Sequence, residues 1–121
     1  MVKVFFAREI LNISQGDQSK KLNLKHEIGD VLCRGERIFV RFKAVGYKTP
    51  ERNIICLGVD GKMLWQVQDP DQWRTGQKYS NADIYVGMGF DDSGSLWVAG
   101  GQSRYRIDMV TGKILEEVYT K

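Results

Sequence analysis

Apolar and polar side chains alternate along most of the chain, in short runs separated by turns that contain glycine. The clearest run follows Gly35, where residues of one parity are aliphatic or aromatic and residues of the other are mostly basic. The first set is Ile38, Val40 and Phe42, and the second is Arg37, Phe39, Arg41 and Lys43. Because successive side chains of a β-strand point to opposite faces, this run predicts a strand with one face buried and one face in solvent.

The same reasoning predicts strands along nearly the whole chain. They are expected over residues 22–27, 31–34, 37–45, 53–59, 62–68, 83–90, 95–99, 102–107 and 113–120. Residues 3–14 fit one strand, or two strands with a bend near residues 7–9, and a helix also fits their spacing. After residue 20 we expect no helix.

About nine or ten short strands at this spacing are typical of an all-β domain. The pair Asp60-Gly61 is a strong hairpin signal, and 13 glycines against two prolines fit tight turns between short strands. We therefore predict a single all-β domain over residues 1–121. It would be an antiparallel hairpin meander in stacked small sheets, like an unclosed propeller fragment or a β-sandwich. Trp65 and Trp97, which follow two of the turns, are predicted to lie in its core.

Several turns share one order of residues: an Asp, a Gly, and an apolar pair that begins the next strand. They occupy residues 60–65, 92–97 and 108–115, and residues 35–39 form a fourth copy without the Asp. The Asp side chain caps such a turn, and the Gly supplies a positive φ.

This pattern resembles the blade hairpins of quinoprotein-like (PQQ-repeat) β-propellers, whose repeats read roughly Asp-x-x-Thr-Gly-Lys-x-x-Trp. The resemblance covers about residues 53–120. A blade takes about 40–45 residues and a propeller at least about four blades, so the chain would hold fewer than three. Quinone binding is not implied, because no separate cofactor-binding motif accompanies the repeats.

A second resemblance rests mainly on the last third of the chain. Its segments are residues 85–87, 96–100, 105–108 and 119–121. They resemble bacterial immunity proteins, which are encoded beside secreted or contact-delivered toxins. The resemblance implies a non-enzymatic protein that binds a cognate toxin domain and covers its active site or a neighbouring surface. We predict this function.

Side chains that carry chemistry are few, and we find no catalytic or metal-binding pattern among them. His26 is the only histidine, and no nucleophile motif accompanies it. Cys33 and Cys56 lie in apolar runs without the spacing of a zinc site. The carboxylates at positions 116 and 117 are adjacent in a strand, so they point to opposite faces. We therefore expect no enzyme, no metal and no cofactor.

The residues predicted to bind the partner lie in a loop and on a strand. Residues 68–82 form the longest segment without a periodic pattern, and long loops in compact domains tend to be functional. Aromatic and arginine side chains dominate interface energetics. The predicted partner-binding residues are Trp73, Arg74, Lys78, Tyr79, Asp69, Asp71, Arg104 and Arg106. Packing of Trp73 back onto the core fits the pattern equally well.

The charged residues suggest nucleic acid as an alternative partner, and the positive net charge limits which toxins the chain could bind. The stripe of Arg37, Phe39, Arg41 and Lys43 could bind RNA or single-stranded DNA, with a base stacked on the ring. The net charge of +3 is too small to indicate nucleic acid by itself. Inhibitors of basic nucleases are usually acidic, so a toxin partner requires a local acidic patch or a toxin with an acidic or neutral surface. The candidates for such a patch are Asp69, Asp71, Asp91 and Asp92.

The N-terminal residues become charged too early for a signal-peptide core, and no apolar run approaches the roughly 20 residues of a membrane helix. We therefore expect a cytoplasmic protein. A monomer and a dimer formed by edge-strand pairing both fit the pattern.

Overall fold

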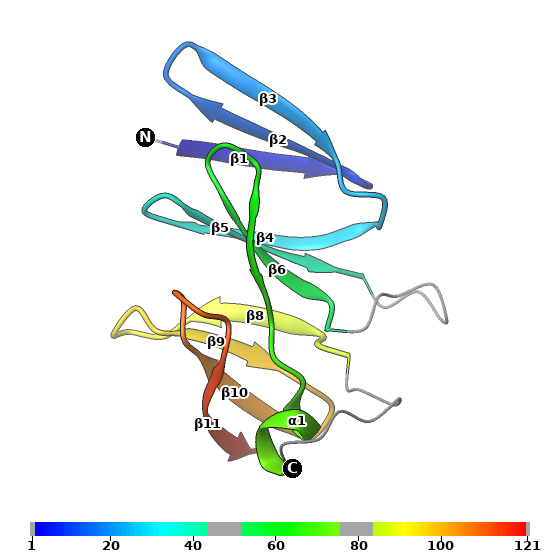
Figure 1. The fold of residues 1–121 in the computed structure, drawn as a ribbon, viewed down its shortest axis with the longest axis vertical. Coiled ribbons are helices and arrows are strands. Elements are labelled where there is room, and N and C mark those ends of the chain that lie inside the picture. Colours follow the sequence, from blue (N-terminus) through cyan, green and yellow to red (C-terminus); the bar gives the residue numbers. More distant parts are fainter. Residues whose placement is uncertain (1, 44–51, 76–83, 121) are drawn as a thin grey trace.

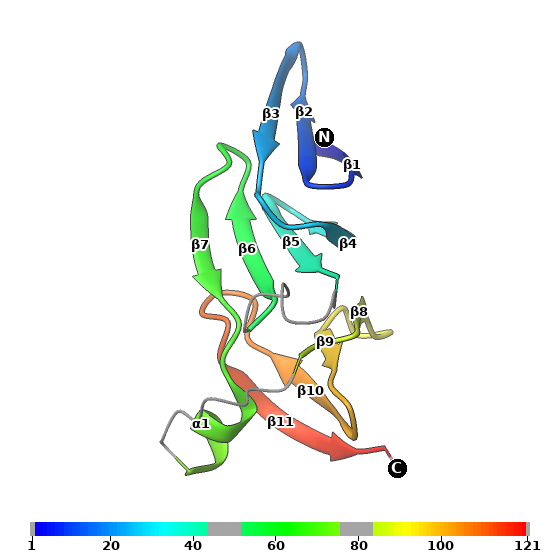
Figure 2. The ribbon, with the colours of Figure 1, turned by 90° about the vertical axis from the view of Figure 1, so that its right-hand side faces the viewer.

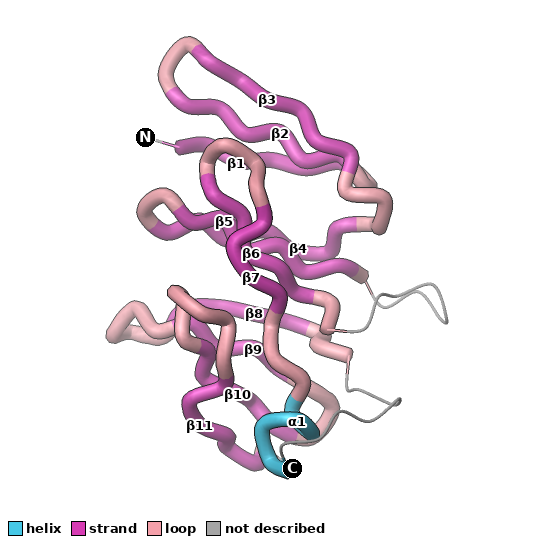
Figure 3. Tube along the Cα trace, viewed as in Figure 1, coloured by secondary structure: helices cyan, strands magenta, loops and turns pink. Residues whose placement is uncertain are grey.

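The computed structural model describes residues 2–43, 52–75 and 84–120 as three small antiparallel sheets, stacked one on another (Figure 1, Figure 3). The first sheet contains β1 (Val2–Ala7), β2 (Ile10–Gln15) and β3 (Gln18–Asn23). The middle sheet contains β4 (Ile28–Arg34), β5 (Arg37–Phe42), β6 (Ile54–Gly58) and β7 (Met63–Gln66). The third sheet contains β8 (Gly87–Phe90), β9 (Leu96–Ala99), β10 (Ser103–Ile107) and β11 (Ile114–Tyr119). A helix, α1 (Pro70–Thr75), follows the middle sheet.

Within each sheet every strand pairs with its neighbour in the sequence, so each sheet is a hairpin meander. The predicted all-β class is confirmed, with eleven strands in the described residues against the nine or ten expected. Residues 3–14 form β1 and β2 and not a helix. The chain reverses between these strands at Arg8, whose φ of 56° lies in the left-handed region that a helix does not use.

Helix α1 corrects the expectation of no helix after residue 20. Proline suits the first position of a helix, because its fixed φ and its missing N–H do no harm there. The N–H of Trp73 donates to the carbonyl of Asp69 at 3.1 Å, which closes the first turn. With six residues the helix is shorter than the window of about 11 over which a helical period can be recognised.

The middle sheet is covered on both faces (Figure 2). One core cluster lies between it and the first sheet, and a larger cluster lies between it and the third sheet. Successive residues of β5 enter different clusters: Ile38 and Val40 belong to the first, and Phe39 to the second. Both faces of β5 are therefore interior.

This arrangement overturns the basic stripe predicted on β5. Its four members are Arg37, Phe39, Arg41 and Lys43. Phe39 is fully buried, with its ring 6.0 Å from that of Phe90 on the third sheet. The side chain of Arg41 is 12% exposed, and its Nε donates to Asp30 at 2.7 Å. A nucleic-acid base has no access to Phe39, because the third sheet occupies that face.

At each boundary between sheets, one side chain covers the turn glycine of the following sheet. The ring of Trp65 on β7 lies so close to Gly112 that a Cβ there would be 2.5 Å from it. The Nε1–H of Trp65 also donates to the carbonyl of Met109 at 2.9 Å. Leu22 on β3 covers Gly61, where a Cβ would lie 2.9 Å away. Both glycines have a positive φ, so two independent constraints favour glycine.

A buried asparagine joins the middle sheet to the segment that precedes β8. The amide nitrogen of Asn53 donates to the carbonyls of Phe42 and Tyr85, both at 2.8 Å. Its oxygen accepts the N–H of Tyr85 at 2.8 Å, and the Tyr85 hydroxyl donates to the carbonyl of Gln68 at 2.7 Å. Because unpaired polar groups are costly in a core, this network helps to fix the third sheet in position.

Candidate functional site

The third sheet has one face in the core and one face that no described sheet covers. Its inner residues include Leu96, Val98 and Tyr105, all of which are buried. Strand pairing places the opposite residues in two rows across the sheet. We call these residues the outer face: Gly89, Trp97, Arg106 and Glu116 in one row, and Gly87, Ala99, Arg104 and Val118 in the next.

The turn between β8 and β9 holds Trp97 in place. The Nε1–H of Trp97 donates to Oδ2 of Asp91 at 2.8 Å. Oδ1 of Asp91 accepts the hydroxyl of Ser93 at 2.7 Å and the N–H groups of Ser93 and Ser95, each at 2.9 Å. These donors, led by the Ser93 hydroxyl, hold the pKa of Asp91 well below its usual range. The turn therefore fixes the carboxylate, and the carboxylate fixes the indole.

Two arginines lie beside the indole and differ in their partners. The guanidinium of Arg104 lies over the ring of Trp97, 5.6 Å from its centroid, which is within cation–π range. Nε of Arg106 donates to Oε1 of Glu116 at 2.6 Å on the neighbouring strand. Among the residues that the structure describes, no carboxylate forms an ion pair with Arg104. Its charge is available to another molecule.

A groove of about 450 Å³ lies beside Trp97 on the outer face. Gly87, Gly89 and Ala99 line it, together with Trp97 and Arg104. A Cβ placed on either glycine would meet no atom within 4 Å. Because these positions carry little or no side chain, the groove has room for a side chain of another molecule.

Trp97 was predicted to lie in the core, and its half-buried position corrects that prediction. By strand register it takes the place in the third sheet that Phe39 takes in the middle sheet. Phe39 on β5 pairs with Cys56 on β6, and Trp97 on β9 pairs with Arg106 at the corresponding point of β10. The third sheet covers Phe39, whereas no described sheet covers Trp97.

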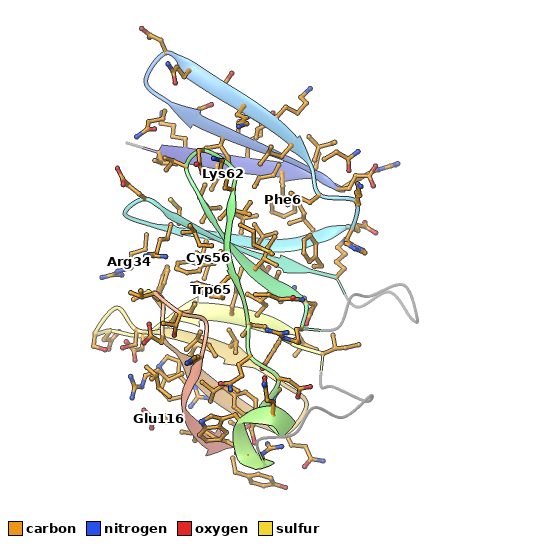
Figure 4. The ribbon with its side chains drawn as sticks, viewed as in Figure 1. Phe6, Arg34, Cys56, Lys62, Trp65 and Glu116 are labelled. Atoms are coloured by element: carbon orange, nitrogen blue, oxygen red, sulfur yellow. The ribbon has the colours of Figure 1, made fainter. Side chains whose placement is uncertain are left out.

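Glu116 occupies the position on β11 that Trp65 occupies on β7 (Figure 4). The strand register shifts just before each of these residues. Trp65 then pairs with Cys56, and Glu116 pairs with Arg106. Trp65 contacts the turn of the following sheet, whereas Glu116 pairs with its own neighbour. The middle sheet contacts the third sheet through Trp65, whereas the outer face of the third sheet carries the charged Glu116 at the same position. A polar outer surface is typical of a terminal unit in a stack.

The residues predicted in the loop after β7 are dispersed. Trp73 packs partly against the core, which is the second of the two placements, partner contact or core packing, that its sequence pattern allowed. Asp69 is fully buried, so its predicted place in an exposed acidic patch is wrong. Lys78 and Tyr79 lie outside the described residues, as does the side chain of Asp71.

Arg74, also predicted to contact the partner, is joined to the third sheet. Its guanidinium donates to the two carboxylate oxygens of Glu117, at 2.5 and 3.2 Å, and to the hydroxyl of Tyr105 at 2.8 Å. The Ser103 hydroxyl donates to the same carboxylate at 2.7 Å. The hydrogen bond from Arg74 lowers the pKa of Glu117, and the same bond raises the pKa of Arg74. This cluster holds α1 against β10 and β11.

Of the predicted binding residues, the structure brings Arg104 and Arg106 together on one face. Sequence reasoning missed Trp97 and the glycines of β8 as members of the site. The signal for them is the alternation Gly87-Met88-Gly89, which removes side chains from one face of a strand. That signal becomes informative only once the face of the third sheet that no described sheet covers has been located.

The described residues contain no group of three or more His, Cys, Asp or Glu side chains placed to hold a metal ion. Cys33 and Cys56 are free thiols, and burial raises the pKa of each. In the same part of the chain, no helix has the length and hydropathy needed to span a bilayer.

Comparison with known proteins identifies the family. Residues 1–119 match a family described as a domain of unknown function, DUF7957. The chain belongs to the DUF7957 family. No curated protein matches this DUF7957 chain. A solved structure of a computationally designed protein, Ika8, is similar to it with a TM-score of 0.52 at 11% identity, and the match covers 98% of this chain and 36% of Ika8. At that identity the likeness concerns the fold alone.

Proposed function

We propose that this DUF7957 chain is a non-enzymatic binding protein that neutralises a cognate bacterial toxin domain by docking the outer face of the third sheet against it. The observation that carries the proposal is the contact between Trp97 and Arg104 on the face of the third sheet that no described sheet covers. Tryptophan and arginine are the residue types most enriched among the side chains that dominate protein interfaces.

The opposite end of the stack supports this choice by contrast. The outer residues of the first sheet include Asn12, Ser14, Ser19 and Lys21. Phe5, 60% exposed, is the one aromatic side chain on that side of the described strands. Among the residues that the structure describes, no arginine stacks on the ring of Phe5, in contrast to Trp97. A fixed aromatic ring loses less conformational freedom on binding than a mobile one.

Charge favours a protein partner over RNA or single-stranded DNA. The predicted stacking residue, Phe39, is buried. On the outer face, the carboxylates of Asp91 and Glu116 lie among the arginines, and they would repel phosphates. Mixed charge around an aromatic ring is typical of protein interfaces.

Co-expression tests the proposal. The chain would be produced together with the product of the neighbouring open reading frame, and growth and co-purification would be measured. We expect the wild type to rescue growth and to co-purify with that product. Failure of the wild type in both assays would refute the proposal.

Matched charge reversals locate the interface. Arg104→Glu changes the outer face, and Lys21→Glu makes the same change at the opposite end of the stack. We expect Arg104→Glu to abolish co-purification and Lys21→Glu to leave it intact, with thermal unfolding confirming that both variants are folded. RNA that co-purifies with the wild type and is released by salt would favour the nucleic-acid function instead.

A further inference from the structure

We infer that the groove beside Trp97 recognises an acidic and apolar segment of the partner: a carboxylate that pairs with Arg104, next to an apolar or aromatic side chain that enters the groove. This inference rests on the proposed function, which leaves the chemistry of the partner open. It assigns separate roles to Arg104 and to the glycine-lined floor.

The carboxylate is inferred from the pairing of the arginines. Arg41, Arg74 and Arg106 each have a carboxylate partner within the chain, at distances from 2.5 to 2.7 Å. Arg104, like Arg34, lies over an aromatic ring and has no carboxylate partner among the described residues, and of these two only Arg104 lines the groove. A guanidinium on an aromatic ring keeps its donors free at the edge, where a carboxylate can accept two of them.

The ring on which Arg104 lies is held in position before any partner arrives. Ser93 and Ser95 orient Asp91, Asp91 accepts the indole N–H, and the indole lies under Arg104. Binding therefore requires little rearrangement of this side of the groove. Prior ordering of this kind reduces the entropy lost on association.

The apolar group is inferred from the middle sheet. There, Phe39 occupies the position of Trp97, and its ring forms a T-shaped contact with Phe90 of the third sheet, with the centroids 6.0 Å apart. The corresponding space beside Trp97 is the groove, where nothing lies within 4 Å of a Cβ placed on Gly87 or Gly89. A partner side chain in the groove would contact Trp97 as Phe90 contacts Phe39.

An acidic partner surface also fits the positive net charge of the chain. A chain with a net charge of +3 is a poor inhibitor of a strongly basic toxin surface. An exposed arginine without a partner suits an acidic surface instead. The toxin face bound by this chain is therefore inferred to be acidic where it meets Arg104.

A pair of small probes tests the inference without the partner. N-acetyl-phenylalanine carries a carboxylate and an aromatic ring, and its primary amide has the same shape without the charge. Each would be titrated into the full chain while the NMR resonance of the Trp97 indole N–H is followed. We expect millimolar binding of the acid, on the order typical of fragments, and roughly tenfold weaker binding of the amide.

Variants complete the test. Arg104→Gln should weaken binding of the acid roughly tenfold and leave the amide unaffected, whereas Lys21→Gln should change neither. Equal binding of acid and amide, or no shift of the Trp97 resonance with either, would overturn the inference. Co-purification with the neighbouring gene product would still stand in that event, so the two proposals fail separately.

Discussion

Two turn glycines mark the places where one sheet meets the next. Gly112 lies under the ring of Trp65, and Gly61 lies under Leu22. Gly16, in the corresponding turn of the first sheet, also has a positive φ, of 59°, yet no atom lies within 4 Å of the position of its Cβ. Gly16 therefore has only the constraint of a left-handed backbone, whereas Gly61 and Gly112 have that constraint and close packing between sheets as well.

Substitution of these glycines by alanine should have unequal effects. Gly16→Ala introduces only the strain of a left-handed backbone, which costs about 1 kcal/mol of unfolding free energy. Gly112→Ala adds a methyl group 2.5 Å from the Trp65 ring, and the total loss should reach about 3 kcal/mol or more. Denaturant titration of both variants measures the difference. Equal losses would mean that the contact between Trp65 and Gly112 contributes little to the stack.

The alternation of β5 shows what a sequence can and cannot predict about single residues. It correctly assigns Phe39 and Ile38 to opposite faces, because the period of a strand is two. It carries no information about what covers each face. Phe39 was therefore predicted to be exposed and is buried, and Trp97 was predicted to be buried and is half exposed.

At the scale of elements, α1 depends on the third sheet for its position. It has six residues, which is too short for a helix to be stable by itself in water. Arg74 joins it to Glu117 of β11 and to Tyr105 of β10. The ion pair is partly exposed, with 38% of the Arg74 side chain and 23% of the Glu117 side chain accessible, so its net contribution to stability is reduced by solvent.

This ion pair predicts a dependence of stability on acid. Because Arg74 lowers the pKa of Glu117 in the folded chain, the unfolded chain binds the proton more readily. The stabilisation is present above the unfolded pKa, at about 4.3, and is lost as the pH falls through the lower folded value. Thermal unfolding from pH 6 to pH 2 should therefore show a smaller acid-induced loss of stability in Glu117→Gln than in the wild type. Identical profiles would show that the pair contributes nothing.

Elements with a strong local signal were predictable from sequence, and those without one were not. The strands on either side of Asp60-Gly61 were predicted because turn chemistry and alternation agree there. Helix α1 was missed because six residues show no period. The site was found only in part: the shared face of Arg104 and Arg106 follows from alternation, but the groove depends on which sheet ends the stack.

At the scale of the whole molecule, the middle sheet is an interior layer, and each of the two outer sheets has one face that no described strand covers. The stack is held by contacts between side chains of one sheet and turns of the next. The third sheet carries Glu116 where the middle sheet carries Trp65, so its outer face does not repeat that contact. It presents Trp97 and Arg104 beside a groove, and this is the surface proposed to bind the partner.

Amide hydrogen exchange tests this claim most directly. The exchange of the chain alone would be compared with that of its complex with the product of the neighbouring open reading frame. We predict slower exchange in the complex over residues 87–106, with no change over the first sheet, residues 2–23. Protection confined to the first sheet, or the absence of any protection in a stable complex, would contradict the claim that the outer face of the third sheet binds the partner.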